Sequence, residues 1–109
     1  MEQEQQIPII QEKVIDTKKN ITVFSIEGED HTLGNLIRCQ IERNKSVIFS
    51  GYQMPHPLHD LIEVRVQTIR CENPKSVFVD SIRTLEREAN DLLSLFQIEL
   101  ERWNNKMRD

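Results

Sequence analysis

The chain has 109 residues, of which 38% are hydrophobic and 29% charged, and its formal net charge is −4 at pH 7. This length suits one domain, no apolar run approaches the roughly 18 residues of a transmembrane helix, and two cysteines are too few for a disulfide scaffold and indicate a reducing compartment. The acidic, glutamine-rich start differs from secretory and transit peptides, and the acidic balance argues against autonomous nucleic-acid binding, so we expect a small intracellular domain with a thin core.

The first 30 residues contain an irregular segment and then a strand. Residues 1–19 show no sustained hydrophobic period, and we expect an extended or partly ordered N-terminal arm there. The segment ITVFSI at 21–26 is rich in β-branched and aromatic residues, which predicts a strand. Residues 27–30 then form an acidic turn.

A helix is expected after this turn, with either Asp30 or Thr32 as its N-cap. Gly34 lies in its first turn, where glycine is unfavourable for a helix. It indicates either that another backbone approaches closely or that this is an ordinary surface glycine. The helix ends near Asn44, and its apolar residues form one stripe, Leu33, Leu36, Ile37 and Ile41.

Two more strands follow, separated by a stiff loop. Residues 47–52 predict the first of them, and Pro55 and Pro57 make the segment at 53–59 extended. At 61–69 apolar and polar residues alternate, which predicts a strand with one buried face. That face carries Ile62, Val64, Val66 and Thr68.

The last element is a long helix. Asn73 is a suitable N-cap and Pro74 suits the first helical position, and no proline or glycine follows for about 30 residues. Its apolar residues recur at alternating spacings of four and three, which is a heptad seam. The seam consists of Phe78, Ile82, Leu85, Ala89, Leu92 and Phe96, and it is widened by Leu93, Leu100 and Trp103.

The element order β-α-β-β-α predicts an α+β fold, a small antiparallel sheet packed on two helices. Thirty helical residues span about 45 Å, whereas a globule of this size is roughly 30–35 Å across. The helix therefore overhangs its domain with apolar side chains that need a cover. We expect a partner protein to supply it; otherwise the last turns fray into solvent.

Two groups of side chains raise the question of catalysis. His56, His59 and Asp60 could bind zinc or iron. The flanking prolines, however, keep the two imidazoles off a common helical face, and we favour a polar loop with solvated or hydrogen-bonded histidines. His31 beside Asp30 could act as a general base, yet no nucleophile or phosphate-binding motif accompanies it. We expect no catalytic site, no metal and no cofactor.

Two segments carry a more specific signal. Residues 29–38 read EDHTLGNLIR and residues 51–58 read GYQMPHPL. They resemble the two signatures of the small alpha-like subunit of multisubunit RNA polymerases, a family that includes the archaeal L subunit and its counterparts in the eukaryotic nuclear enzymes. The HTLGN stretch is also similar to the helix start of bacterial alpha subunits. The resemblance covers about residues 20–103, so we expect the dimerisation domain at 20–109.

The resemblance implies a noncatalytic subunit that pairs with a larger alpha-like subunit. The pair would form the platform for the two large catalytic subunits and would contact other small subunits. It implies no sequence-specific nucleic-acid binding and no membrane association, and nuclear localisation for a eukaryotic member.

The resemblance also assigns three sets of contact residues. The long helix would offer its seam, Phe78, Ile82, Leu85, Ala89, Leu92, Leu93, Phe96, Leu100 and Trp103. The first helix would offer the family motif, His31, Thr32, Leu33, Gly34, Asn35, Leu36, Ile37 and Arg38. A loop would meet neighbouring subunits through Gly51, Tyr52, Pro55, His56, Pro57 and Leu58.

Two details are more similar to the RNA polymerase II subunit than to the small subunit shared by polymerases I and III. They are Leu58 at the end of the PHPL motif and the tail FQIELERW at 96–103. The shared subunit stays as the alternative within the family. A free-standing homodimeric module, whose long helix pairs with a second copy, is the alternative from another class.

Overall fold

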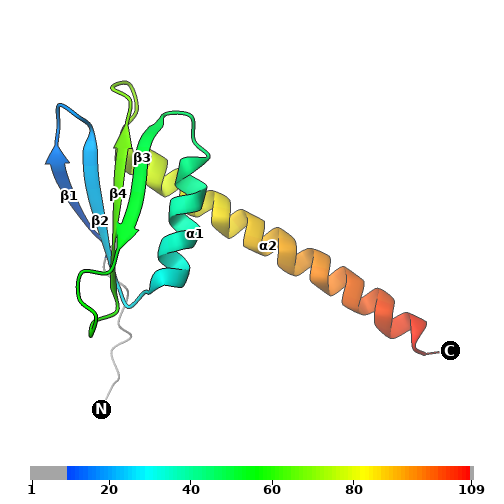
Figure 1. Cartoon of the computed structure of the whole chain (residues 1–109). Helices are drawn as coiled ribbons and strands as arrows, with labels where there is room; N and C mark the ends of the chain where they lie inside the picture. Colours follow the sequence, from blue (N-terminus) through cyan, green and yellow to red (C-terminus); the bar gives the residue numbers. More distant parts are fainter. Residues whose placement is uncertain (1–9, 109) are drawn as a thin grey trace, which may run out of the picture.

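Six elements follow one another in the computed structural model, which describes residues 10–108 (Figure 1). They are β1 (Ile10–Asp16), β2 (Ile21–Glu27), α1 (His31–Glu42), β3 (Val47–Gln53), β4 (Leu61–Thr68) and α2 (Pro74–Lys106). The strands form one sheet in the order β1-β2-β4-β3, and every neighbouring pair is antiparallel. The predicted α+β fold is thereby confirmed, with one additional strand.

The core lies between the sheet and the two helices. The alternation in β4 is as predicted, because Ile62, Val64 and Val66 are each 0% exposed. Facing them from the helices are residues of α1 and of the first turns of α2 only. The buried apolar cluster consists of Phe24, Ile26, Ile37, Ile41, Ile62, Val64, Val66, Val77 and Phe78.

The additional strand is β1, within the segment that we expected to be an extended arm. It pairs with β2 from Ile10 opposite Ile26 to Asp16 opposite Ile21. Six of its seven residues are exposed, so no buried face produced an alternating pattern in the sequence. Pairing with β2 through the backbone makes the segment a strand. The expected arm also includes residues 1–9, which lie outside the described part of the chain.

Both helix starts follow from their capping residues. Asp30, and not Thr32, caps α1, because its side chain accepts a hydrogen bond from the Thr32 backbone N–H at 2.9 Å. Asn73 caps α2 in the same way and accepts from the Lys75 N–H at 2.9 Å, with Pro74 in the first turn. These caps satisfy N–H groups that have no partner inside a helix.

The shape of the molecule is set by α2. The helix has 33 residues, about 50 Å at 1.5 Å per residue, and it projects well beyond the sheet (Figure 1). The radius of gyration is 18.2 Å, against about 13 Å for a compact domain of this length. Within the described residues, neither helix has a stretch long and apolar enough to cross a membrane.

Candidate subunit interface

The apolar stripe of α2 divides into a buried part and an open part. At the start of the helix, Phe78 is 2% exposed, and its ring stacks on that of Phe24 with centroids 4.0 Å apart. Ile82 and Leu85 are partly buried against the same core. From Glu86 to the end of the helix every residue is exposed. The domain core therefore uses the first three turns of α2 and leaves the rest uncovered.

The uncovered part of α2 carries large apolar side chains. Leu92 is 68% exposed, Phe96 62% and Trp103 59%. At 100° per residue these three lie on the same side of the helix as Phe78 and Leu85. The face that enters the core thus continues past the end of the domain. Burying each such side chain would contribute about 1.5–3 kcal/mol. A row of exposed apolar side chains of this kind is typical of an interaction surface.

Two further exposed apolar residues of α2 were not singled out from the sequence. Leu95 is 61% exposed and Ile98 52%. Leu95 follows Leu92 by three residues and therefore lies beside the stripe, whereas Ile98 lies on another side of α2. The heptad spacing could not reveal them, because they fall outside it.

The family motif at the start of α1 is held by an aromatic contact. Gly34 is buried, and a Cβ added there would lie 2.6 Å from Cδ2 of Tyr52. The group that approaches Gly34 is therefore a side chain of β3 and not a backbone. Tyr52 Oη also lies 3.3 Å from His31 Nδ1, within hydrogen-bonding distance. Glycine, tyrosine and histidine together fix α1 against the edge of the sheet.

The residues expected at the partner interface separate by exposure. Phe78, Gly34 and Ile37 are buried within the domain itself, where they pack in this chain's own core. Leu33, Ile82 and Leu85 are intermediate. Those left open are His31, Thr32, Asn35, Leu36, Ala89, Leu92, Leu93, Phe96, Leu100 and Trp103.

Arg38 is also intermediate in exposure. Its guanidinium is held on α1, where it donates to Asn35 Oδ1 at 2.6 Å and to Glu42 Oε1 at 2.9 Å. The backbone carbonyl of Arg38 lies 3.5 Å from the Ser50 hydroxyl, which donates to it from β3. Arg38 thus joins the exposed side of α1 to the neighbouring strand.

The expected subunit-contact loop is shorter than its six residues suggested. Gly51 and Tyr52 lie inside β3, so only Pro55, His56, Pro57 and Leu58 belong to the connection between β3 and β4. Leu58 is 95% exposed. An apolar side chain so fully in water at the tip of a proline-stiffened loop remains a candidate contact point.

The two catalytic hypotheses find no supporting geometry. The carboxylate of Asp30 is engaged in capping α1, and His31 is paired with Tyr52 instead. The rings of His56 and His59 are 6.1 Å apart and nearly perpendicular. In the stretch from residue 10 to 108, no three His, Cys, Asp or Glu side chains are grouped so as to hold a metal ion.

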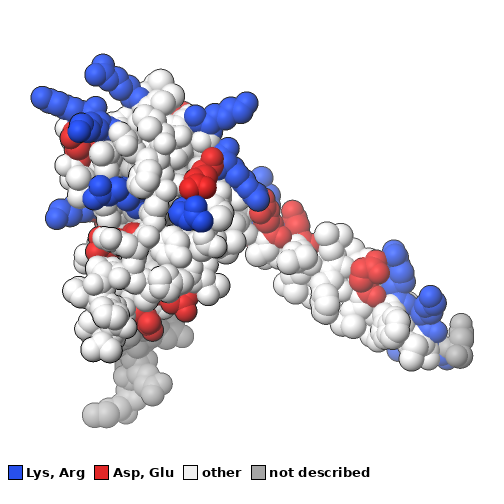
Figure 2. Space-filling view, viewed as in Figure 1, with Lys and Arg blue, Asp and Glu red and all other residues white. Residues whose placement is uncertain are grey.

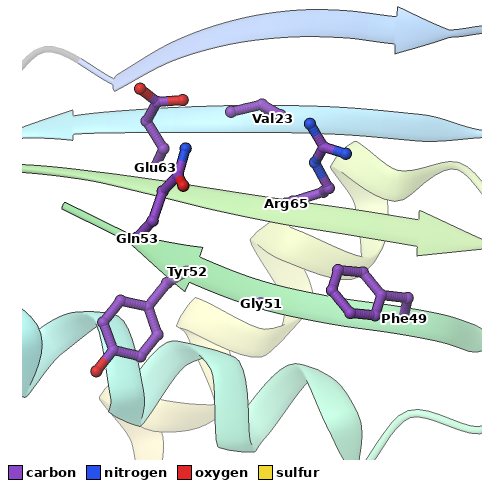
Figure 3. Close-up of a pocket in the computed structure, with 7 residues that line it drawn as sticks. All are labelled: Val23, Phe49, Gly51, Tyr52, Gln53, Glu63 and Arg65. Atoms are coloured by element: carbon purple, nitrogen blue, oxygen red, sulfur yellow. The ribbon is translucent and has the colours of Figure 1, made fainter. Parts of the chain in front are cut away.

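A hollow of about 260 Å³ lies on the face of the sheet opposite the helices (Figure 3). It forms where Gly51 has no side chain, and a Cβ there would lie 3.1 Å from the Phe49 ring. Figure 3 shows Tyr52 pointing to α1, away from the other polar groups. The lining offers a carboxylate, a guanidinium and an amide, but no nucleophile with a base. It consists of Val23, Phe49, Gly51, Tyr52, Gln53, Glu63 and Arg65.

The comparison against known families agrees with these features, namely an uncovered apolar helix face, a small α+β domain and the α1 motif. Residues 22–94 match the model of the RNA polymerase Rpb3/Rpb11 dimerisation domain. The chain belongs to this family. The matched region contains the α1 motif and Leu92, and it ends before Phe96 and Trp103.

Relatives of the Rpb3/Rpb11 family cover most of the chain. The DNA-directed RNA polymerase II subunit rpb11 of Dictyostelium discoideum is 41% identical over 84% of this chain and 78% of its own length. RPB11 of Schizosaccharomyces pombe is 37% identical over 85% and 74%. The archaeal subunit Rpo11 of Saccharolobus islandicus is 40% identical over 72% and 85%.

A solved structure has the same fold. RNA polymerase subunit L of Thermoplasma acidophilum superposes with a TM-score of 0.71 at 25% identity, over 89% of this chain and 95% of its own. The resemblance to the small alpha-like subunits is thereby confirmed at the level of family and fold.

Proposed function

We propose that this chain is a noncatalytic assembly subunit of RNA polymerase II. It pairs with the larger alpha-like subunit, and the pair forms the platform on which the two large catalytic subunits are assembled in the nucleus. The observation that carries the proposal is the apolar stripe of α2, which continues in the open from Ala89 to Trp103 on a dimerisation-domain fold. No cofactor has a part in this role.

The stripe fits a protein partner for a physical reason. Leu92, Phe96 and Trp103 are each more than half exposed, whereas aromatic and large aliphatic residues are typical of the buried centres of protein interfaces. A partner helix of matching length would bury them and complete the heptad packing. The α1 residues Thr32 and Leu36 are exposed beside the same core and would extend the contact.

The assignment to polymerase II rests on relatives. The matches from Dictyostelium and fission yeast are named as polymerase II subunits. The subunit shared by polymerases I and III is the alternative, and co-expression separates the two. We expect a 1:1 complex with the larger alpha-like subunit of polymerase II from the same genome, and none with that of polymerases I and III.

A tagged chain in native extract tests the wider role. It should recover the alpha-like subunit and both large catalytic subunits. Recovery of none of these proteins, together with a stable, monodisperse dimer of the purified chain, would contradict the proposal and support the homodimeric module.

A further inference from the structure

The sheet and α1 form the head of the molecule. The connections between its elements are basic at one end of the sheet and acidic at the other. Three connections lie at one end of the sheet, at 17–20, 43–46 and 69–72, and together they hold five Lys or Arg residues against one Glu. We call this surface the basic end. Its positive residues are Lys18, Lys19, Arg43, Lys45 and Arg70.

The three connections form one continuous surface, because hydrogen bonds join them. Asn20 donates from Nδ2 to the carbonyl oxygens of Ile69 at 2.8 Å and of Glu72 at 3.2 Å. The Ile69 N–H donates to the Ser46 carbonyl at 2.9 Å. Figure 2 shows Lys and Arg side chains gathered at the upper end of the sheet, where these connections lie in Figure 1.

The opposite end of the sheet is acidic. Its connections, 28–30 and 54–60, are joined by the Gly28 N–H, which donates to the Asp60 carbonyl at 2.6 Å. They carry Glu29, Asp30 and Asp60 and no Lys or Arg. The strands separate the two ends by roughly 25 Å, about three Debye lengths at physiological salt. The acidic end therefore does not neutralise the basic end.

Most of the positive charge at the basic end is also locally unpaired. Arg43 lies 4.0 Å from Glu88. Within residues 10–108, Lys18, Lys19, Lys45 and Arg70 form no ion pair. Although the net charge of the chain is −4, these four unpaired cations lie together on one surface. Such a surface would bind anionic groups preferentially.

The side chains around these cations favour an acidic protein segment over nucleic acid. Ile69, within the basic end, is 40% exposed, and Ile48, which borders it, is 60% exposed. Apolar residues among cations suit a peptide with both carboxylates and aliphatic side chains. The three connections contain no aromatic residue on which a base could stack.

We infer that the basic end docks an acidic segment of a neighbouring polymerase subunit other than the alpha-like partner. The inference rests on the proposed function, because it needs the assembled enzyme. It gives the head of the molecule a second contact, separate from the α2 stripe and electrostatic in character.

Carbodiimide crosslinking tests the contact in the native enzyme, purified through a tag on this chain. The reagent joins a lysine amine to a touching carboxylate without a spacer. We expect Lys18, Lys19 or Lys45 linked to Asp or Glu of another subunit. Crosslinks at these lysines confined to this chain, or none at all while lysines of other subunits react, would overturn the inference. So would crosslinks that disappear after nuclease treatment.

A charge-reversed pair supplies the matched variant. Lys18→Glu/Lys19→Glu keeps the turn, because the backbone N–H groups of both residues, and not their side chains, bind Asp16 Oδ1. Lys13→Glu/Arg87→Glu makes the same charge change elsewhere on the surface. The first variant should retain the alpha-like subunit. As salt is raised, however, its affinity for the crosslinked subunit should become about tenfold weaker than that of the wild type.

The control variant should behave as wild type. Equal salt sensitivity in the two variants would contradict the inference. Failure of the wild-type chain to recover any alpha-like subunit would instead contradict the proposed function, so the two failures are distinguishable.

Discussion

Gly34 and Tyr52 determine how closely α1 lies against β3. The Tyr52 ring leaves too little room for a Cβ at residue 34, because its atoms lie 2.6 and 3.0 Å from that position, and its hydroxyl lies within hydrogen-bonding distance of His31. The HTLGN motif thus has a structural explanation within this chain: histidine and glycine accept one aromatic side chain of the neighbouring strand. No catalytic role is needed to account for either residue.

Gly34→Ala should destabilise the domain by about 1–3 kcal/mol, because the added Cβ forces the Tyr52 ring to move. Helix propensity alone predicts the opposite sign, a gain of about 1 kcal/mol. Urea denaturation at low micromolar concentration, followed by circular dichroism, measures the free energy of unfolding.

Two further variants control this prediction. Gly51→Ala should cost less, since its Cβ meets only the exposed, adjustable Phe49 ring at 3.1 Å. In a Tyr52→Ala background the penalty of Gly34→Ala should disappear. A penalty that persists without the tyrosine ring would show that another contact constrains Gly34.

At the scale of the element, α2 combines two functions along one face. Phe78 belongs to the domain core and Leu92 to the uncovered stripe, although both sit in the same heptad pattern. Periodicity reports that a face is apolar, but it does not report what covers that face. The boundary between the two functions falls between Leu85 and Ala89, where the sheet and α1 end their contact with the helix.

Leu92→Asp should leave the fold intact and abolish pairing. Leu92 is 68% exposed in the chain, so its replacement should change the free energy of unfolding by less than about 0.5 kcal/mol. In the complex the unpaired charge would be buried, at a cost of about 3–5 kcal/mol, and affinity for the alpha-like partner should fall at least about 100-fold. Isothermal titration or co-purification measures the loss.

Two variants bracket this result. Ser94→Asp introduces the same charge on the opposite side of α2 and should pair normally. Phe78→Ala should destabilise the domain itself by about 3–5 kcal/mol, since it removes a stacked core ring. Normal pairing by Leu92→Asp would mean that the stripe does not form the interface.

The whole molecule consists of a small head and the long, partly apolar helix α2, which projects from it (Figure 1). Its extents of 65 × 45 × 24 Å exceed those of a compact domain. Half of the large apolar side chains that are exposed in the described residues lie in the short stretch from Leu92 to Met107. A single chain therefore cannot enclose its own apolar surface. The head adds a charge separation that the net charge of −4 conceals.

The purified chain should self-associate as its concentration rises, because the α2 stripe remains in contact with water. Analytical ultracentrifugation should show heterogeneous, concentration-dependent species for the chain alone and one 1:1 species after co-expression with the alpha-like partner. A monodisperse monomer of the chain alone, stable at high concentration, would contradict the expectation that the stripe needs a cover.

The sequence by itself determined most of the elements. The alternation in β4, the capping residues Asn73 and Pro74 and the heptad seam of α2 are all local patterns, and each produced the expected structure. The two motif segments determined the family. These signals are readable because the residues that cause them are neighbours along the chain.

Only the tertiary structure decided the rest. Three features depend on which distant segments meet. They are the pairing of β1 with β2, the burial of Phe78 while Leu92 is exposed, and the contact of Tyr52 with Gly34. The basic end likewise exists because Asn20 joins a turn to residues some 50 positions away. Long-range packing determines which residues each segment meets, and a one-dimensional pattern contains no record of it.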